Sequence, residues 1–151
     1  MGEINYSINH INVDAMGLPL EKMNTISFGN GPKRIIAFVD PLCGHCNSFI
    51  KKALKRKDEF TFKIIVVPAL GDKSNVLAKS LFCASDKSQA LELFLENKLH
   101  TLPQTGSCDT KFYDLTLFTA QSFGIKAVPF FIAPDGRFKA GVGDIWNWAK
   151  K

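Results

Sequence analysis

The sequence predicts an α/β domain with a central mixed sheet flanked by helices. A short, almost continuous apolar run over residues 34–39 is typical of a strand buried on both faces. A helical pattern over 44–57 and a β-rich run over 61–67 follow at the spacing of a strand–helix–strand unit. Near the C-terminus, two further strand-like runs flank a tight turn. The length of 151 residues suits one folding unit, so we expect a single domain over residues 1–151.

The first half of the chain supplies three predicted strands. Residues 4–12 alternate loosely between apolar and polar side chains, which favours an edge strand. Glycines and a proline at 29–32 signal a turn before the buried strand over 34–39. The helix over 44–57 carries apolar side chains on one side and lysines on the other. The strand over 61–67 should therefore lie parallel to the strand over 34–39.

A helical insert about 70–123 separates this unit from the C-terminal strands. Helical spacing of apolar residues predicts three helices within it. They span 75–84, 88–99 and 110–123. Gly124 ends the last helix, as glycine commonly does.

The C-terminal part of the chain predicts an antiparallel hairpin and a helix. A strand over 129–133 begins at a proline and is followed by a tight turn at 134–137. A second strand over 138–142 returns beside it. Residues 144–151 form a short terminal helix.

Composition excludes several classes of protein. With 46% hydrophobic and 22% charged residues, the chain should be a folded globule rather than disordered. No apolar run approaches the roughly 20 residues of a membrane span, so we expect no stable membrane insertion. The net charge of +5 includes a basic cluster at 51–57, which is typical of a solvated helix face. Because no nucleic-acid-binding motif accompanies that cluster, we expect no nucleic-acid partner.

Cys43 and Cys46 form a Cys-x-x-Cys motif at the start of the helix over 44–57. The helix N-terminus offers free backbone N–H groups and a positive dipole end, which favour a thiolate. Since the thiolate is the attacking species, Cys43 is predicted to be the nucleophile. Cys46, one turn further on, would resolve the mixed disulfide. A protonated His45 between them would stabilise the thiolate further.

Other uses of this spacing have less support. A structural zinc site needs further ligands, and Cys83 and Cys108 are isolated from each other in the sequence. Haem attachment requires a histidine where Asn47 follows Cys46. A purely structural bridge between Cys43 and Cys46 would close too short a loop to add much stability. We therefore expect redox chemistry with neither a metal nor a cofactor.

A second motif lies at Gly124-Ile125-Lys126-Ala127-Val128-Pro129, before a strand and a glycine turn. It resembles the cis-proline segment of the thioredoxin superfamily. That resemblance implies a thioredoxin fold in which Pro129 packs beside the redox cysteines. It also implies that the Val128–Pro129 bond is cis and that the Val128 backbone pairs with an extended substrate. The alternative is a proline that merely begins an edge strand.

Three further segments resemble one family more closely. Phe38–Cys46, Leu81–Lys87 and Gly106–Asp109 are similar to the catalytic domain of the bacterial periplasmic disulfide isomerases, the DsbC/DsbG family. The likeness extends from about Arg34 to the C-terminus. It implies a structural disulfide between Cys83 and Cys108 and hence export to an oxidising compartment, the periplasm. A buried, inert Cys83 is the alternative.

Several features depart from that family. Only 33 residues precede Arg34, too few for the family's N-terminal dimerisation domain, so we expect a monomer. Val128 stands where the isomerases commonly have threonine, as in DsbA-type oxidases. The Cys-Gly-His-Cys version is associated with eukaryotic protein disulfide isomerases. Ala37 occupies the position of the buried acid of thioredoxin. The N-terminus lacks a signal peptide, so the chain is either cytosolic or exported after its signal is removed.

These observations predict a thiol–disulfide oxidoreductase. The main hypothesis is a DsbC-like isomerase or reductase acting on exported proteins that carry thiols or disulfides. A membrane redox partner would recycle Cys43 and Cys46. A DsbA-like thiol oxidase is the first alternative. A redox-inactive thioredoxin-fold binding or assembly module is the alternative of another class.

Overall fold

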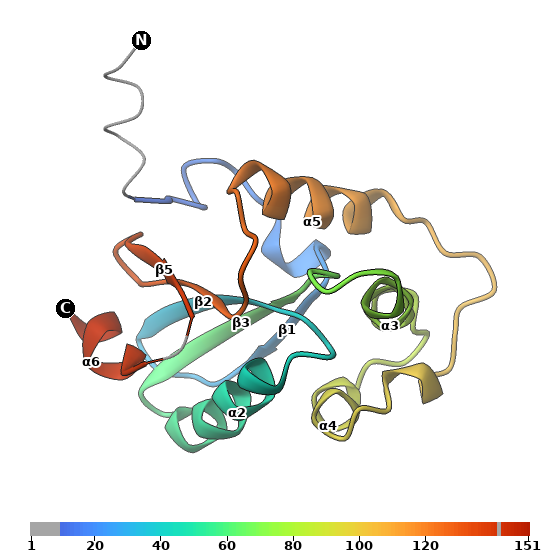
Figure 1. Cartoon of the computed structure of the whole chain (residues 1–151), viewed down its shortest axis with the longest axis horizontal. Coiled ribbons are helices and arrows are strands. Elements are labelled where there is room, and N and C mark those ends of the chain that lie inside the picture. The colour runs from blue at the N-terminus through green and yellow to red at the C-terminus, as the bar shows by residue number, and fades with distance from the viewer. Residues whose placement is uncertain (1–9, 142) are drawn as a thin grey trace, which may run out of the picture.

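The computed structural model describes residues 10–141 and 143–151. A five-stranded sheet in the order β1-β3-β2-β4-β5 forms its centre, with helices around it (Figure 1). The strands are β1 (Thr25–Phe28), β2 (Lys33–Val39), β3 (Phe60–Val66), β4 (Phe130–Ile132) and β5 (Phe138–Ala140). The helices are α2 (Gly44–Ala53), α3 (Asp72–Phe82), α4 (Ala90–Leu95), α5 (Lys111–Ser122) and α6 (Ile145–Lys150). Among these described strands only β2 and β3 pair in parallel, so the predicted mixed sheet is confirmed.

The β2–β3 pair is the buried centre of the sheet. The two strands align from Lys33 opposite Phe60 to Val39 opposite Val66. The five residues from Ile35 to Val39 are at most 1% exposed, as the apolar run predicts for a strand covered on both faces. The parallel alignment follows from the crossover through α2. It brings both strands to an end at the same edge, where α2 begins.

Side chains alternate between two hydrophobic clusters, one on each face of the sheet. Ile35, Ala37 and Val39 join the cluster beneath α2, α3, α4 and α6. Ile36 and Phe38 join the cluster beneath α5 and the segment that precedes β1. Figure 1 shows α5 above the sheet and α2 below it. The sheet is therefore the middle layer of three.

The helical insert is fastened to the sheet by a buried asparagine. Asn24 is 2% exposed, and its side-chain amide donates to the carbonyl oxygens of Val66 in β3 and Ala78 in α3, each at 3.0 Å. Its backbone N–H donates to Thr116 Oγ in α5 at 3.0 Å. Asn24, the residue directly before β1, thus joins the sheet to both long helices of the insert, α3 and α5.

The edge strand differs from the sequence prediction. Of the predicted strand over 4–12, residues 4–9 lie outside the described residues, and residues 10–12 form no strand. Ile11 instead buries its side chain in the cluster beneath α5, and its N–H donates to the carbonyl oxygen of Gly136 at 2.7 Å. The edge is formed by β1, which pairs antiparallel with β3. The four-residue length of β1 explains why no alternation revealed it.

The predicted helices are present with shifted bounds: α3 begins three residues before the predicted 75–84 and ends two residues before it, and the others are shorter than predicted. The helix predicted over 44–57 is α2 followed by a 3-10 turn at Leu54–Arg56, and the one predicted over 88–99 is α4 followed by a 3-10 turn at Leu99–Thr101. α4 ends early because Asn97 takes a left-handed conformation, with φ at 58°. The N–H of Lys98 then bonds back to the carbonyl oxygen of Leu93 at 2.7 Å, which closes the helix. Within residues 10–141 and 143–151, no helix is both long and apolar enough to cross a membrane.

Candidate active site

Cys43 and Cys46 meet at the first turn of α2. Cys43 is the residue that caps this helix, and the backbone N–H of Cys46 donates to Cys43 Sγ at 3.2 Å. The N–H of Asn47 donates to the carbonyl oxygen of Cys43 at 3.1 Å. The sulfur therefore receives one of the N–H groups that a helix N-terminus leaves without an intrahelical partner. The positive end of the helix dipole therefore points at Cys43 Sγ.

The two thiols differ in exposure. Both are free thiols, but Cys43 is partly exposed whereas Cys46 is fully buried. Burial raises the pKa of the Cys46 thiol far above its ordinary value, and the hydrogen bond with the Cys43 side chain raises it further. Cys46 is therefore a neutral thiol at neutral pH. A molecule in solution reaches Cys43 first.

The segment before β4 lies against this pair. The Val128–Pro129 peptide bond is cis, Pro129 is buried and Val128 is half-buried. The Cys43 thiol donates to the carbonyl oxygen of Val128 at 3.8 Å. The alignment of Phe38 opposite Phe130 explains this contact, because the chain leaves β2 and enters β4 at the same end of these two strands. The structure thus brings together the two motifs that the sequence separates.

A cavity of about 260 Å³ opens beside the pair, between α2, β4 and α6. His45 and Lys52 line it from exposed positions on α2, with Pro129 on the side of β4 and Trp146 from α6. The remaining lining residues are Ser48, Phe49, Phe131, Gly141, Gly143 and Ile145. Its lining combines apolar side chains such as Phe49 and Phe131 with the exposed His45 and Lys52, and this mixture suits a polypeptide side chain that carries an acidic or polar end.

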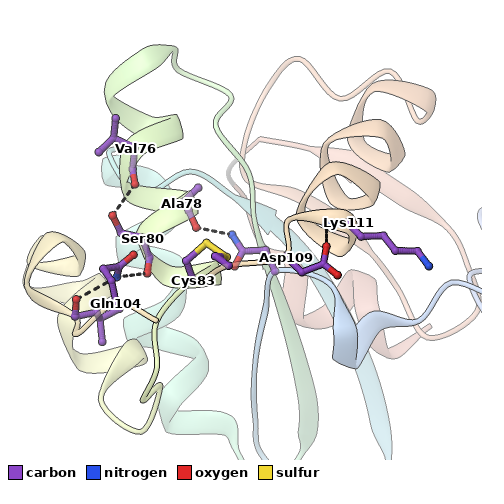
Figure 2. Close-up of a disulfide and its surroundings, with 10 residues drawn as sticks. Val76, Ala78, Ser80, Cys83, Gln104, Asp109 and Lys111 are labelled. Carbon is purple, nitrogen blue, oxygen red and sulfur yellow. Dashed lines mark hydrogen bonds between the residues drawn. A yellow bond between two sulfur atoms is a disulfide. The ribbon is translucent and has the colours of Figure 1, made fainter. Parts of the chain in front are cut away.

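Cys83 and Cys108 are joined by a disulfide with a Cα–Cα distance of 5.5 Å. It links the C-terminus of α3 to the loop that leads into α5, and Figure 2 shows the polar contacts around it. Among these, Gln104 Nε2 donates to the carbonyl oxygen of Ser80 at 2.8 Å. Within the described residues, no group of three or more His, Cys, Asp or Glu side chains is arranged to hold a metal ion.

Asp40 is a site residue that the sequence analysis did not single out. It follows β2 directly and its side chain is 0% exposed. Its carboxylate accepts from the N–H of Leu42 at 2.7 Å, from the N–H of Leu70 at 2.8 Å and from Ser74 Oγ at 2.7 Å. A carboxylate directly after the apolar run at 35–39 was the available signal, since such groups are rarely buried without partners.

The sheet order, the cis-proline segment and the helix-capping cysteine define a thioredoxin-fold domain with a Cys-x-x-Cys site. A disulfide interchange protein from Neisseria gonorrhoeae has a similar structure, with a TM-score of 0.65 and 22% identity over 87% of this chain and 93% of that one. A periplasmic thioredoxin-like protein from Salmonella enterica serovar Typhimurium gives 0.66 and 16% identity over 93% of each chain. The predicted thioredoxin fold is confirmed.

Sequence comparison adds a more specific likeness. A probable thiol:disulfide interchange protein DsbC from Bordetella avium is 28% identical in an alignment that covers 82% of this chain and 48% of that protein. Its counterpart from Bordetella pertussis is 26% identical over 80% of this chain and 42% of that protein. The chain thus spans about half the length of these relatives or less. No protein-family model matches it. The resemblance to DsbC-type proteins expected from the sequence is confirmed.

Proposed function

We propose that this chain is a thiol–disulfide oxidoreductase in which Cys43 attacks and Cys46 resolves. The observation that carries the proposal is the pairing of an accessible sulfur with a buried one. Cys43 Sγ accepts the N–H of Cys46 at 3.2 Å, while the Cys46 thiol lies fully buried behind it. Only one of the two sulfurs is therefore open to a protein substrate.

The reaction consists of two exchange steps. The Cys43 thiolate attacks one sulfur of a substrate disulfide, and the other substrate sulfur leaves as a thiolate. Cys46 then loses its proton and attacks Cys43 Sγ, which closes the Cys43–Cys46 disulfide and releases the substrate as a dithiol. Two electrons pass from the enzyme to the substrate. Run in reverse, the same steps oxidise a dithiol, and release of a rearranged substrate before the second step is isomerisation.

Val128 and Pro129 would hold the substrate chain during this exchange. The carbonyl oxygen of Val128 accepts the Cys43 thiol at 3.8 Å in the reduced protein. When Cys43 enters a mixed disulfide it has no proton to donate, so this acceptor becomes available to a backbone N–H of the substrate. An extended substrate segment bound in this way gains a main-chain hydrogen bond whatever its sequence. His45, exposed at the rim of the neighbouring cavity, would add positive charge near the sulfur when protonated.

Within this class we propose a DsbC-like isomerase or reductase that acts on exported proteins in the periplasm. Its support is the likeness to the Bordetella proteins, which are named probable thiol:disulfide interchange protein DsbC. The chain would work as one domain, with the Cys83–Cys108 bridge as a structural element, and a membrane redox partner would recycle the cysteines. Val128 favours a DsbA-like oxidase as the second candidate, because DsbA-type oxidases share this residue.

The test is reactivation of a scrambled, multi-disulfide protein in a glutathione buffer, with wild type compared with Cys43→Ala. We expect the wild type to restore activity and the variant to fail. A Cys46→Ser variant should accumulate a mixed disulfide with the substrate, visible by mass spectrometry. Exchange without reactivation would favour the oxidase. If the wild-type protein exchanges with no thiol at all, that result would contradict the proposed oxidoreductase activity and favour a binding module.

A further inference from the structure

Asp40 ties the loop that carries Cys43 to the helical insert. Its carboxylate receives Leu42 N–H from that loop, Leu70 N–H from the connection after β3 and Ser74 Oγ from α3. Its backbone carbonyl oxygen accepts the N–H of Cys43 at 3.1 Å. One residue therefore sets where the chain turns between β2 and α2, and it does so with contacts drawn from three segments.

All three side-chain contacts are donated to Asp40, which is the pattern of an ionised carboxylate. The described part of the chain holds no ion pair to Asp40, so backbone and hydroxyl dipoles alone stabilise its charge. Asp40 is 0% exposed, and solvent screens it poorly. After burial and the contact with Cys43, Asp40 acts on the pKa of Cys46 in two opposite ways: a backbone hydrogen bond with Asp40 lowers this pKa, and the negative charge of Asp40 raises it.

We propose that Asp40 is a positioning residue whose buried charge sets the redox potential of the Cys43–Cys46 pair toward the reducing side. This inference rests on the proposed oxidoreductase function. The reduced pair can carry a negative charge on Cys43, whereas the disulfide carries none. A fixed anion nearby therefore raises the free energy of the reduced form more than that of the disulfide. Both carboxylate oxygens already accept hydrogen bonds, so Asp40 acts by positioning the loop and by the electrostatic field of its charge.

The first test measures the equilibrium of the pair with glutathione in Asp40→Asn. Asparagine keeps the size of the side chain and removes the charge. We expect the equilibrium constant for forming the protein disulfide to fall at least about tenfold, which is a potential about 30 mV more oxidising. The fraction of Cys43 present as thiolate at neutral pH, read from ultraviolet absorbance, should rise in parallel. Asp72→Asn is the control, because Asp72 is an exposed carboxylate in the first turn of α3.

A second variant separates the charge from the loop geometry. Ser74→Ala removes one donor but keeps the carboxylate, so the remaining charge is less compensated. We expect this variant to shift the potential in the opposite direction, toward a more stable disulfide, with Ser80→Ala on the same helix as the control. If Asp40 only held the loop in place, Asp40→Asn and Ser74→Ala would shift the redox potential in the same direction.

Two results would contradict a role for the Asp40 charge in setting the redox potential. An Asp40→Asn equilibrium within about twofold of the wild type contradicts it, because a poorly screened unit charge acts more strongly than that. Shifts of the same sign in both variants also contradict it. If Asp40→Asn does not fold, the sign of the Ser74→Ala shift alone decides the question. A wild type that does not exchange with glutathione contradicts the proposed function and is recognised before any variant is compared.

Discussion

The thiol of Cys43 lies 3.8 Å from the carbonyl oxygen of Val128, although 85 residues separate the two positions in the chain. The contact follows from the sheet, because β2 and β4 are antiparallel neighbours whose ends meet at one edge. Of the two sulfurs in the pair, it places the partly exposed one, Cys43 Sγ, beside a backbone acceptor. Thiol chemistry at this edge should therefore be selective for Cys43.

Alkylation tests that selectivity. Iodoacetamide at neutral pH should modify Cys43 at least about 100-fold faster than Cys46, because the reactive species is an accessible thiolate. Burial both shields Cys46 and raises the pKa of its thiol. Peptide mapping by mass spectrometry distinguishes the two sites. Cys46→Ser should keep the fast reaction and Cys43→Ser should lose it, whereas equal rates at the two cysteines would contradict the assignment.

The cavity beside α2 should favour acidic substrates. Lys52→Glu is expected to lower kcat/KM for a peptide disulfide with acidic flanking residues by about fivefold at low salt, with a smaller effect on a basic peptide. Lys55→Glu is the matched control, since Lys55 is exposed on the following turn and does not line the cavity. The difference between the two variants should shrink as salt is added. Equal effects of both substitutions on kcat/KM would contradict a role for the cavity in substrate binding.

The Cys83–Cys108 bridge should contribute to stability without contributing to the exchange reaction. It closes a loop with a sequence separation of 25 residues. The double variant Cys83→Ser/Cys108→Ser should lose roughly 3.5 kcal/mol of unfolding free energy, since the unfolded chain regains the freedom of the open loop. Urea denaturation measures the loss, and glutathione exchange at Cys43 should persist. A variant of unchanged stability, or one that is folded but inactive, would contradict this role.

Tyr113 should make the stability depend on pH in the alkaline range. Burial, with a smaller contribution from the charge of Asp114, raises the pKa of Tyr113 to about 12. The unfolded chain releases this proton near pH ~10, so it binds fewer protons than the folded protein between the two values. The contribution of Tyr113 is therefore complete below about pH 10 and is lost as the pH rises toward 12, by up to roughly 2 kcal/mol.

Denaturation of Tyr113→Phe isolates this effect. The variant loses the hydrogen bond from Tyr113 Oη to Asn75 Oδ1, which measures 2.6 Å, and should be less stable at neutral pH. The difference in unfolding free energy between wild type and variant should narrow above about pH 10. A difference that stays constant with pH would show that Tyr113 titrates at its ordinary value.

The centre of this fold was predictable because its signals are local. The buried strand at 34–39 and the helix after Cys43 each carry their periodicity within a few residues, and both are present as β2 and α2. β1 was missed because four residues are too few to show alternation, and its partner β3 lies far along the chain. The end of α4 was misplaced because it depends on the backbone conformation of one residue, Asn97.

The candidate site was predictable to the same extent. The cysteine pair and the proline segment each have a recognisable pattern, and their contact could be expected from the resemblance. Asp40 could not be assigned a place in the site from the sequence, because two of its donors, Leu70 and Ser74, come from a segment 30 or more residues away. A buried carboxylate is explained only by its partners, and tertiary structure decides which these are.

The anchor at Asn24 contains no sulfur. It connects β3, α3 and α5 through amide, carbonyl and hydroxyl groups, so the docking of the insert on the sheet does not require an oxidant. These three hydrogen bonds do not involve Cys83 or Cys108, so the insert keeps a polar attachment to the sheet that does not depend on the oxidation state of the bridge.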